Sequence, residues 1–304
     1  MSGARRILVV VHPRRPDAAS LAAEVIARLD AAGVTVLLDP LSADVLDPGT
    51  RALVHLATGP DPAAGCELVL VLGGDGTILR GAEWSRSAHA PLLGVNLGHV
   101  GFLAETEREH AHASIDRILD RDYAVTERMT LDVIAHVDGV EVARTFALNE
   151  ATVEKAARER MLELTVEIDG RPISTWGCDG VVMATPTGST AYAFSAGGPV
   201  IWPDVEAMLV VPISAHALFS RPMVLSPRSL LAVDIVAGTE GHGALWCDGR
   251  RAVDLPAGAR VEVCRGAHPV LLARLIDQPF TDRLVEKFGL SVHGWRGSRA
   301  AESP

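Results

Sequence analysis

Apolar residues form continuous runs in the first hundred positions of the chain, and each run breaks into polar or glycine-rich sequence. Between the first two runs lies an Ala- and Leu-rich segment, which we expect to form a helix capped by Asp17 and ending near Gly33. Strands that alternate with helices and glycine turns predict a Rossmann-like open parallel α/β sheet. The runs expected to be buried strands are residues 7–11, 34–39, 66–72 and 91–96.

After a predicted helix over residues 106–119, the apolar pattern changes to a period of two, which is typical of antiparallel strands with one buried face. Asp-Gly pairs at 138–139, 169–170 and 248–249 are typical of hairpin turns. The clearest of these strands span residues 131–137, 162–168 and 230–236. The sequence therefore predicts an α/β domain over residues 1–125 and a mostly antiparallel, β-rich domain over 126–275. Residues 276–304 are expected to hold a helix at 282–288, packed back on the first domain, and then a flexible tail.

Composition narrows the class of protein. With 304 residues, 48% apolar and 22% charged, the chain is long enough for about two domains with real cores. The net charge of −10 argues against nucleic acid as a partner, and the aliphatic runs are far shorter than a membrane span needs. The four cysteines show neither zinc-ligand spacing nor a disulfide framework. We therefore expect a soluble cytoplasmic protein without nucleic-acid or membrane partners.

The run at 66–72 ends in Gly73-Gly74-Asp75-Gly76-Thr77. Such a turn brings backbone N–H groups and a helix N-terminus against a phosphate, because glycine has no side chain to keep an oxyanion away. An aspartate beside phosphates repels them unless it binds through a magnesium ion or takes a proton from the attacking hydroxyl, and both are phosphoryl-transfer roles. The alternative is an ordinary turn in which Asp75 bonds its own backbone.

Two standard nucleotide motifs are missing from the sequence, the lysine-containing P-loop and a complete G-x-G-x-x-G. The chain has only two lysines, Lys155 and Lys287, so phosphate charge must be met by backbone, metal or arginine. Arg80, three residues after Thr77, is placed to reach back toward the turn; a solvated helix arginine is the alternative. A dehydrogenase is therefore disfavoured.

A second segment, residues 179–199, is rich in glycine and hydroxyl side chains and has no charge after Asp179. Small hydroxyl residues at a helix start donate to sugars and phosphates, and Tyr192 can stack on a base. We interpret the segment as a ligand pocket, with a capped helix packed on a sheet as the alternative. Asn149-Glu150 follows an apolar run and can read a purine edge or ribose hydroxyls, although a loop cap explains the pair equally well.

Together these segments resemble the NAD kinase family, including its bacterial ATP- and polyphosphate-using members. The resemblance rests on residues 73–77, on NLGHVGFL at 96–103, on Asn149-Glu150, on 179–200 and on VPISAHALFSRPMV at 211–224. The glycine turn alone also occurs in lipid kinases of the diacylglycerol and sphingosine type; TPTGSTAYAFSAGGP at 185–199 favours the NAD kinases. The resemblance implies an α/β domain followed by a β-rich domain with the active site between them.

The resemblance also implies a role for individual residues. Asp75 would be the general base that takes the proton from the 2′-hydroxyl of the adenosine ribose of NAD, and Phe102 would pack against a ring. The phosphates would be cradled by Gly73, Gly74, Gly76 and Thr77, and the ribose or nicotinamide side of the acceptor held by Asn149 and Glu150. The adenosine subsite would be lined by Asp179, Thr190, Ala191, Tyr192, Ala193, Phe194 and Ser195. Further contacts are implied at Arg80, Arg160, Ser214 and Asp248.

The implied reaction transfers a phosphoryl group from ATP or inorganic polyphosphate to NAD, with a phosphate-bound divalent ion, Mg²⁺ or Mn²⁺, in a homodimer or homotetramer. Gly177 stands where some family members carry arginine, and we hypothesise that its small size admits NADH as well as NAD. Two other functions remain open at this stage. One is a lipid kinase, disfavoured because no basic patch or amphipathic anchor is evident; the other is a catalytically silent NAD(P)-binding regulator, against which Asp75 argues.

Overall fold

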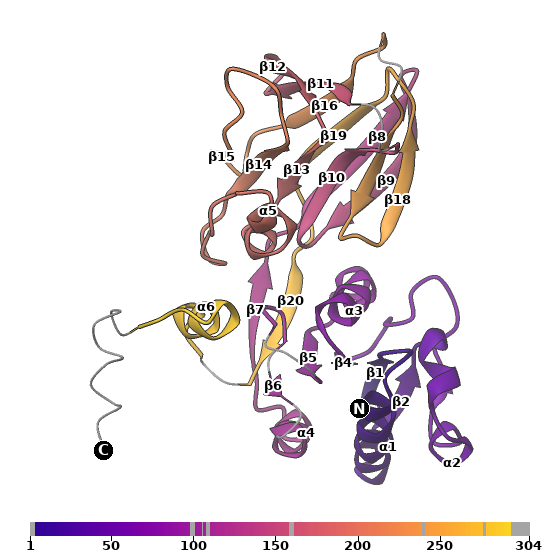
Figure 1. The fold of residues 1–304 in the computed structure, drawn as a ribbon. Coiled ribbons are helices and arrows are strands. Elements are labelled where there is room, and N and C mark those ends of the chain that lie inside the picture. Colours follow the sequence, from indigo (N-terminus) through magenta and orange to yellow (C-terminus); the bar gives the residue numbers. More distant parts are fainter. Residues whose placement is uncertain are drawn as a thin grey trace, which may run out of the picture. The chain divides into compact units, whose positions relative to one another are not determined.

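The computed structural model describes residues 4–97, 101–104, 106–107, 110–157, 161–238, 241–275 and 278–292. The chain divides into two compact units, residues 1–127 with 271–304 and residues 128–270 (Figure 1). These boundaries lie within five residues of the expected domain limits at 125 and 275. The C-terminal segment belongs to the first unit because strand β20 (Val270–Arg274) pairs with a strand of that unit's sheet.

The first unit is built on one sheet in the order β3-β2-β1-β4-β5-β20-β7, with β6 paired to β5. The strand pairs from β3 through β20 are parallel, as expected for strands joined by helical crossovers. Its strands are β1 (Arg6–Val11), β2 (Thr35–Leu38), β3 (His55–Leu56), β4 (Leu68–Leu72), β5 (Leu92–Asn96), β6 (Thr106–Glu107) and β7 (Ala124–Arg128), besides β20. Every residue of β4 and β5 is buried, which explains their unbroken apolar sequence.

Helices cover both faces of this sheet. Helices α1 (Pro16–Ala31) and α4 (Ala111–Leu119) share one apolar core with β1, β2, β4 and β5. Helix α3 (Asp75–Ala88) lies on the opposite face, where Gly81 brings its backbone close: a methyl group there would lie 2.5 Å from Val71 and 2.9 Å from Leu92. The remaining helices of the unit are η1 (Pro40–Val45), α2 (Pro48–Arg51) and α6 (Phe280–Phe288).

Two local expectations for the first unit were wrong. Helix α1 begins at Pro16 with Arg15 as its N-cap, and Asp17 lies in the first turn, where it pairs with Arg15 instead of capping the helix. Proline favours the first helical position because its missing N–H is not needed there. The predicted helix over 106–119 begins only at Ala111, because β6 at its start pairs with β5 and extends the sheet.

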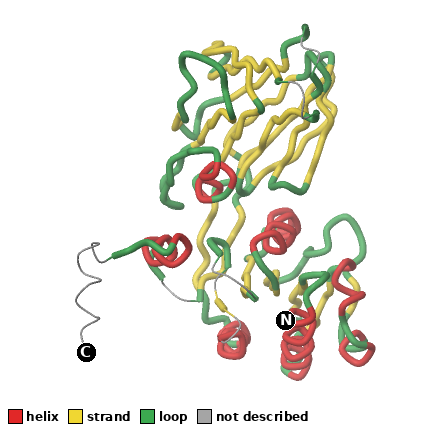
Figure 2. Tube along the Cα trace, viewed as in Figure 1, coloured by secondary structure: helices red, strands yellow, loops and turns green. Residues whose placement is uncertain are grey.

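In the described part of the chain, the second unit consists of two six-stranded antiparallel sheets. Side chains of both sheets form one core around Trp176. Figure 2 shows this unit as mostly strand and loop. One sheet runs β15 (Met223–Leu225), β14 (Met208–Ile213), β13 (Gly180–Ala184), β10 (Glu150–Lys155), β17 (Gly243–Cys247) and β18 (Arg251–Leu255); the other runs β12 (Arg171–Cys178), β11 (Leu162–Ile168), β16 (Leu231–Ile235), β19 (Arg260–Arg265), β8 (Leu131–Val137) and β9 (Val140–Ala147).

The three Asp-Gly pairs form the predicted hairpin turns between β8 and β9, β11 and β12, and β17 and β18. Asp138, Asp169 and Asp248 have φ of 51°, 52° and 54°, and the glycine after each also has positive φ. Positive φ at both central residues defines the turn whose twist matches the flanking strands, and it explains the glycine at the second place. Short helices η3 (Thr187–Thr190) and α5 (Tyr192–Ser195) follow β13.

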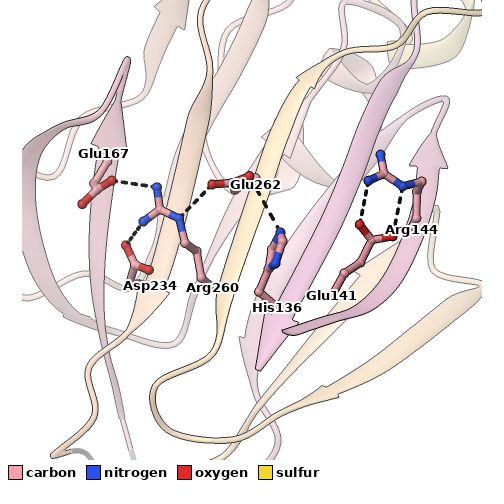
Figure 3. A network of polar contacts seen from close by, with 7 residues as sticks. All are labelled: His136, Glu141, Arg144, Glu167, Asp234, Arg260 and Glu262. Atoms are coloured by element: carbon pink, nitrogen blue, oxygen red, sulfur yellow. Dashed lines mark hydrogen bonds and ion pairs between the residues drawn. The ribbon is translucent and has the colours of Figure 1, made fainter. Parts of the chain in front are cut away.

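An ion-pair network crosses four strands of the second sheet (Figure 3). The Arg260 guanidinium lies 2.9 Å from Glu167 on β11, 2.6 Å from Asp234 on β16 and 3.0 Å from Glu262 on its own strand. His136 on β8 lies 3.8 Å from Glu262. Because the three carboxylates repel one another without Arg260, this side chain favours the observed register of three neighbouring strands.

The predicted fold class, a Rossmann-like α/β domain with a mostly antiparallel β-rich domain, is confirmed. None of the helices in the described part of the chain has the length and apolar character to cross a membrane.

Candidate active site

The turn Gly73–Thr77 lies where β4 ends and α3 begins, at the carboxyl edge of the parallel sheet. Gly73 donates its N–H to Val95 on β5, and a methyl group at Gly73 would lie 2.6 Å from the Thr77 hydroxyl. By contrast, methyl groups at Gly74 and Gly76 would meet no atom of the described residues within 4 Å. Gly73 is therefore needed for the fold of the turn, whereas Gly74 and Gly76 leave their backbone open to a ligand at a helix N-terminus.

Asp75 is the first residue of α3, and its Oδ1 atom is buried without a hydrogen-bond partner in the described part of the chain. The backbone of Gly101 lies directly against this carboxylate: a methyl group at Gly101 would overlap Oδ1 and lie 3.1 Å from Cγ. A buried carboxylate oxygen without a donor is costly, and among the described residues none donates to this oxygen, which leaves it available to a ligand.

Arg80 is buried, with an exposed fraction of 5%, so it is not the solvated arginine of the alternative reading. Its Nη2 donates to the carbonyl of Val11 at 2.6 Å and pairs with Asp39 at 3.0 Å. These partners lie at the ends of β1 and β2. Arg80 thus joins the carboxyl ends of two strands beside the glycine turn, a structural role that its place in the sequence did not reveal.

Phe102 follows Gly101 and lies between two rings of helix α6. Its ring centroid is 5.8 Å from that of Phe280 and 5.8 Å from that of Phe288. Phe102 therefore packs on rings of α6, and its predicted contact with a ligand stays a prediction.

In the second unit, Asn149 lies between β9 and β10, and Glu150 begins β10. The Asp248 carboxylate fixes this corner: it accepts the N–H of Leu148 at 3.0 Å and that of Asn149 at 2.8 Å. Arg251 donates to the same carboxylate at 2.7 Å, with its guanidinium 4.3 Å from the centroid of the Phe146 ring. Asp248 therefore positions the Asn149-Glu150 pair from the neighbouring hairpin.

Burial raises the pKa of Glu150 to about 8, assisted by the nearby charges of Asp248 and Glu154. The N–H of Tyr192 donates to this carboxyl group and opposes the shift, while Oε2 is buried without a partner among the described residues. At neutral pH Glu150 is therefore mostly protonated, and its O–H can donate a hydrogen bond to a ligand.

The segment after β13 packs directly on Asn149. A methyl group at Gly188 would overlap the Asn149 carbonyl and lie 2.8 Å from its Cα. Thr185 accepts the Gly188 N–H at 3.0 Å and donates to Leu148 at 2.6 Å. The hydroxyls of Thr185 and Ser189 are therefore engaged inside the protein, and so do not point toward a ligand.

Several residues of this segment stay exposed. Tyr192 and Phe194 have exposed fractions of 37% and 41%, Ser195 is exposed, and Thr190 and Ala191 are half-buried. Ala193 alone among residues 190–195 is buried, in a small core with Val182 and Leu209. Tyr192 lies beside the Asn149-Glu150 pair, since it contacts Glu150 through its backbone N–H and Glu154 through its hydroxyl at 3.4 Å.

A second group of predicted residues comes together around Asp179. The Lys155 ammonium lies 2.5 Å from the Asp179 carboxylate and, with a hydrogen bond from Ser214, holds its pKa below the usual range. His216 donates its N–H to the Gly177 carbonyl at 2.8 Å. A side chain at Gly177 would meet only the end of Met161, 3.7 Å from its Cβ. Gly177, Asp179 and Ser214 thus form one cluster.

Arg160, a further predicted contact, lies outside the described residues. Sequence reasoning did not assign roles to Thr185, Lys155 or Arg251. Two arginines follow the Asp-Gly turn, and the sequence does not show that the second, Arg251, is the one that pairs with Asp248; nor does it pair Lys155 with Asp179.

The described residues offer no cluster of three or more His, Cys, Asp or Glu side chains able to hold a metal ion. Asp75, with its unpartnered Oδ1, is a single oxygen donor beside a turn suited to phosphates. This donor set fits a magnesium ion that is held mainly by substrate phosphates and water, which is the usual mode for that ion.

Comparison with known proteins agrees on one family. Residues 7–123 match the ATP-NAD kinase N-terminal domain, and residues 148–275 match the ATP-NAD kinase C-terminal domain. The NAD kinase 2 of Streptomyces avermitilis is 57% identical over 296 residues, covering 97% of this chain and 98% of that protein. The NAD kinase of Leifsonia xyli subsp. xyli is 58% identical over 299 residues, covering 98% of each.

Solved structures with this fold include two of known kinases. Yeast NADH kinase complexed with NADH matches with a TM-score of 0.84 and 26% identity, covering 95% of this chain and 89% of that one. An NAD kinase from Archaeoglobus fulgidus in complex with ATP matches with a TM-score of 0.70 and 23% identity, covering 94% of this chain and 100% of that one; at this identity it supports the fold alone.

Proposed function

The chain belongs to the NAD kinase family, and we propose that it transfers a phosphoryl group to the 2′-hydroxyl of the adenosine ribose of NAD, with Asp75 as the general base. The family membership makes it a phosphotransferase. The observation that supports the role of Asp75 is its place: a carboxylate on the first turn of α3, between two glycines with open space beside them and with Oδ1 unpartnered among the described residues.

In the proposed step, a carboxylate oxygen of Asp75 accepts the 2′-hydroxyl proton as the ribose oxygen forms a bond to the terminal phosphorus of the donor. The bond between that phosphorus and its bridging oxygen breaks, and the shortened donor leaves. Backbone N–H groups of the turn stabilise charge on the phosphates. The exposed backbone at Gly74 and Gly76 supports this role, since no side chain obstructs it.

In the second unit, we propose that the acceptor binds at the corner formed by Asn149, Glu150 and residues 190–195. A protonated Glu150 donates to a ribose or amide oxygen, while Asn149 both donates and accepts. Tyr192 and Phe194 present aromatic surface on which a base can stack. The Asp179 cluster, with Lys155 and Ser214, supplies further polar contacts.

A divalent ion, Mg²⁺ or Mn²⁺, fits the donor set as a phosphate-bound cofactor that Asp75 helps to hold. When bound it neutralises charge that develops on the transferred phosphoryl group. We propose ATP or inorganic polyphosphate as the donor, because either presents the same phosphates to a glycine turn. We also propose a homodimer or homotetramer in the cytoplasm, which sedimentation of the purified protein and fractionation of cells would test.

The acceptor range is proposed to include NADH. Gly177 leaves space next to the Asp179 cluster, where a larger side chain would stand closer to a bound nicotinamide.

Asp75→Asn tests the assigned base. The amide has nearly the same shape as the carboxylate but cannot take the proton, so we expect NAD binding to stay and turnover to fall by at least about 10²-fold. NAD affinity by calorimetry and NADP formation by a coupled assay would be measured on the same preparation. Turnover near that of the wild type would remove Asp75 from this role.

A further inference from the structure

Helix α6 at the C-terminal end of the described chain contacts the segment that packs on Asp75. Arg283 of α6 is buried, with an exposed fraction of 4%, and its Nη1 donates to the carbonyl of Ala104 at 2.7 Å and to that of Phe102 at 3.4 Å. Two rings of the same helix flank Phe102 at 5.8 Å each. A guanidinium and two rings therefore hold residues 101–104 from a helix more than 170 positions later in the chain.

Gly101, the first residue of the segment 101–104, lies against the Asp75 carboxylate. Gly101 lies so close to Asp75 that an added methyl group would overlap Oδ1 and lie 3.2 Å from Oδ2. On its other side, the segment reaches β5, where a methyl group at Gly94 would lie 3.4 Å from the Cα of Ala104. A Cβ at position 101 would overlap the Asp75 carboxylate, so the contact requires a residue as small as glycine.

The contact has a physical consequence for Asp75. The Gly101 backbone covers one face of the carboxylate, which restricts its rotation and keeps water from Oδ1. A base must lie within hydrogen-bond reach of the proton it takes, and a displacement of about 1 Å costs on the order of 10²-fold in rate. The contacts that hold residues 101–104 in place therefore also keep the Asp75 carboxylate within hydrogen-bond distance of the proton that it takes.

We infer that α6 is a positioning element for phosphoryl transfer: Arg283, Phe280 and Phe288 clamp residues 101–104, and Gly101 in turn holds the Asp75 carboxylate in its reactive orientation. This inference rests on the proposed role of Asp75 as the base. Arg283 itself acts through the segment and does not touch substrate.

Gly101→Ala and Arg283→Ala test the two ends of this arrangement. We expect Gly101→Ala to lower kcat by about 10²-fold and Arg283→Ala by about 10-fold, with the KM for NAD within about 2-fold of wild type. Arg283→Lys, which keeps one donor to the Ala104 carbonyl, should recover part of the loss. If Arg283→Ala does not fold, kcat of Arg283→Lys and of Gly101→Ala is compared with that of the wild type instead.

Arg117→Ala is the matched control, since Arg117 also donates to a backbone carbonyl of this unit, that of Leu275, without contacting residues 101–104. It should leave kcat unchanged. Amide hydrogen exchange gives a readout independent of turnover: Arg283→Ala should speed exchange in the peptide that carries residues 101–104, and Arg117→Ala should not.

Combination with other variants separates this inference from the proposed function. In Gly101→Ala/Arg283→Ala, kcat should be no lower than in Gly101→Ala alone, because both changes act on one carboxylate. Likewise, Arg283→Ala should add no loss to Asp75→Asn. If the losses of kcat multiply in either double variant, the positioning role of α6 is refuted while Asp75 can still be the base. The same holds if Asp75→Asn is inactive and Arg283→Ala is fully active. Full turnover in Asp75→Asn overturns the assigned base and this inference with it.

Discussion

Glu150 should make the free energy of unfolding of this protein depend on pH. Its pKa is about 8 in the folded protein against an ordinary value of 4.5, chiefly because the group is buried and secondly because Asp248 lies nearby. Between these values the folded protein keeps the proton and the unfolded chain releases it. The free energy of unfolding therefore falls as the pH rises from about 4.5 to about 8, the opposite of a carboxylate stabilised by an ion pair.

The size of the effect follows from the two pKa values. At about 1.4 kcal/mol per pKa unit, their difference corresponds to about 5 kcal/mol, of which about 3 to 4 kcal/mol is lost between pH 5 and pH 8. Glu150→Gln keeps the shape of the side chain and has no proton to release. The variant should therefore gain about 3 to 4 kcal/mol over the wild type as the pH rises from 5 to 8.

Urea unfolding followed by circular dichroism at several pH values from 5 to 8 measures this difference. Glu163→Gln is the control, because Glu163 is exposed on β11 and the same change of side chain there should follow the wild type at every pH. Parallel curves for Glu150→Gln and the wild type between pH 5 and pH 8 would refute the burial argument, and with it the hydrogen-bond donor assigned to Glu150.

Two further variants test other parts of the structure. Gly177→Arg should fold normally, because among the described residues the added Cβ meets only the flexible end of Met161. The variant should turn over NAD but reject NADH, which we propose the wild type accepts; equal rejection of NADH by both proteins in a steady-state assay would remove the proposed role of Gly177. Arg260→Ala leaves three carboxylates without their shared cation and should lower the free energy of unfolding by about 1 to 2 kcal/mol at pH 7. Arg144→Ala, which breaks an exposed pair with Glu141, should lower it less; equal losses in urea unfolding would show that the Arg260 network does not stabilise the sheet.

The elements that were predicted correctly depend on local chemistry. Unbroken apolar runs marked the buried parallel strands, and the Asp-Gly pairs marked hairpins because few other residues adopt positive φ at both turn positions. The glycine turn was recognised from its glycines directly after an apolar run, and one of them, Gly73, is required locally because Thr77 lies against it. Such constraints act between residues close in the sequence, so the elements that depend on them can be predicted from the sequence.

The contacts that the sequence did not reveal join distant segments. The pairing of Arg80 with Asp39, the carboxylate of Asp248 beneath Asn149 and the contact of Arg283 with Ala104 each depend on the tertiary fold. The helix expected from residue 106 failed similarly, since the pairing of Thr106–Glu107 with β5 outweighed a local helical preference. Likewise, the sequence did not show that the Thr185 and Ser189 hydroxyls bond the backbone around them.

The central claim is that this chain phosphorylates NAD at the ribose 2′-hydroxyl, and its most direct test is turnover of the purified protein with NAD and magnesium, in parallel arms with ATP and with polyphosphate. An NADP-specific dehydrogenase reads the product. We expect NADP to form in at least one arm, and turnover to fall by at least about 10²-fold in Asp75→Asn. Binding of NAD without NADP from either donor would contradict it and would identify the chain as a silent dinucleotide-binding protein.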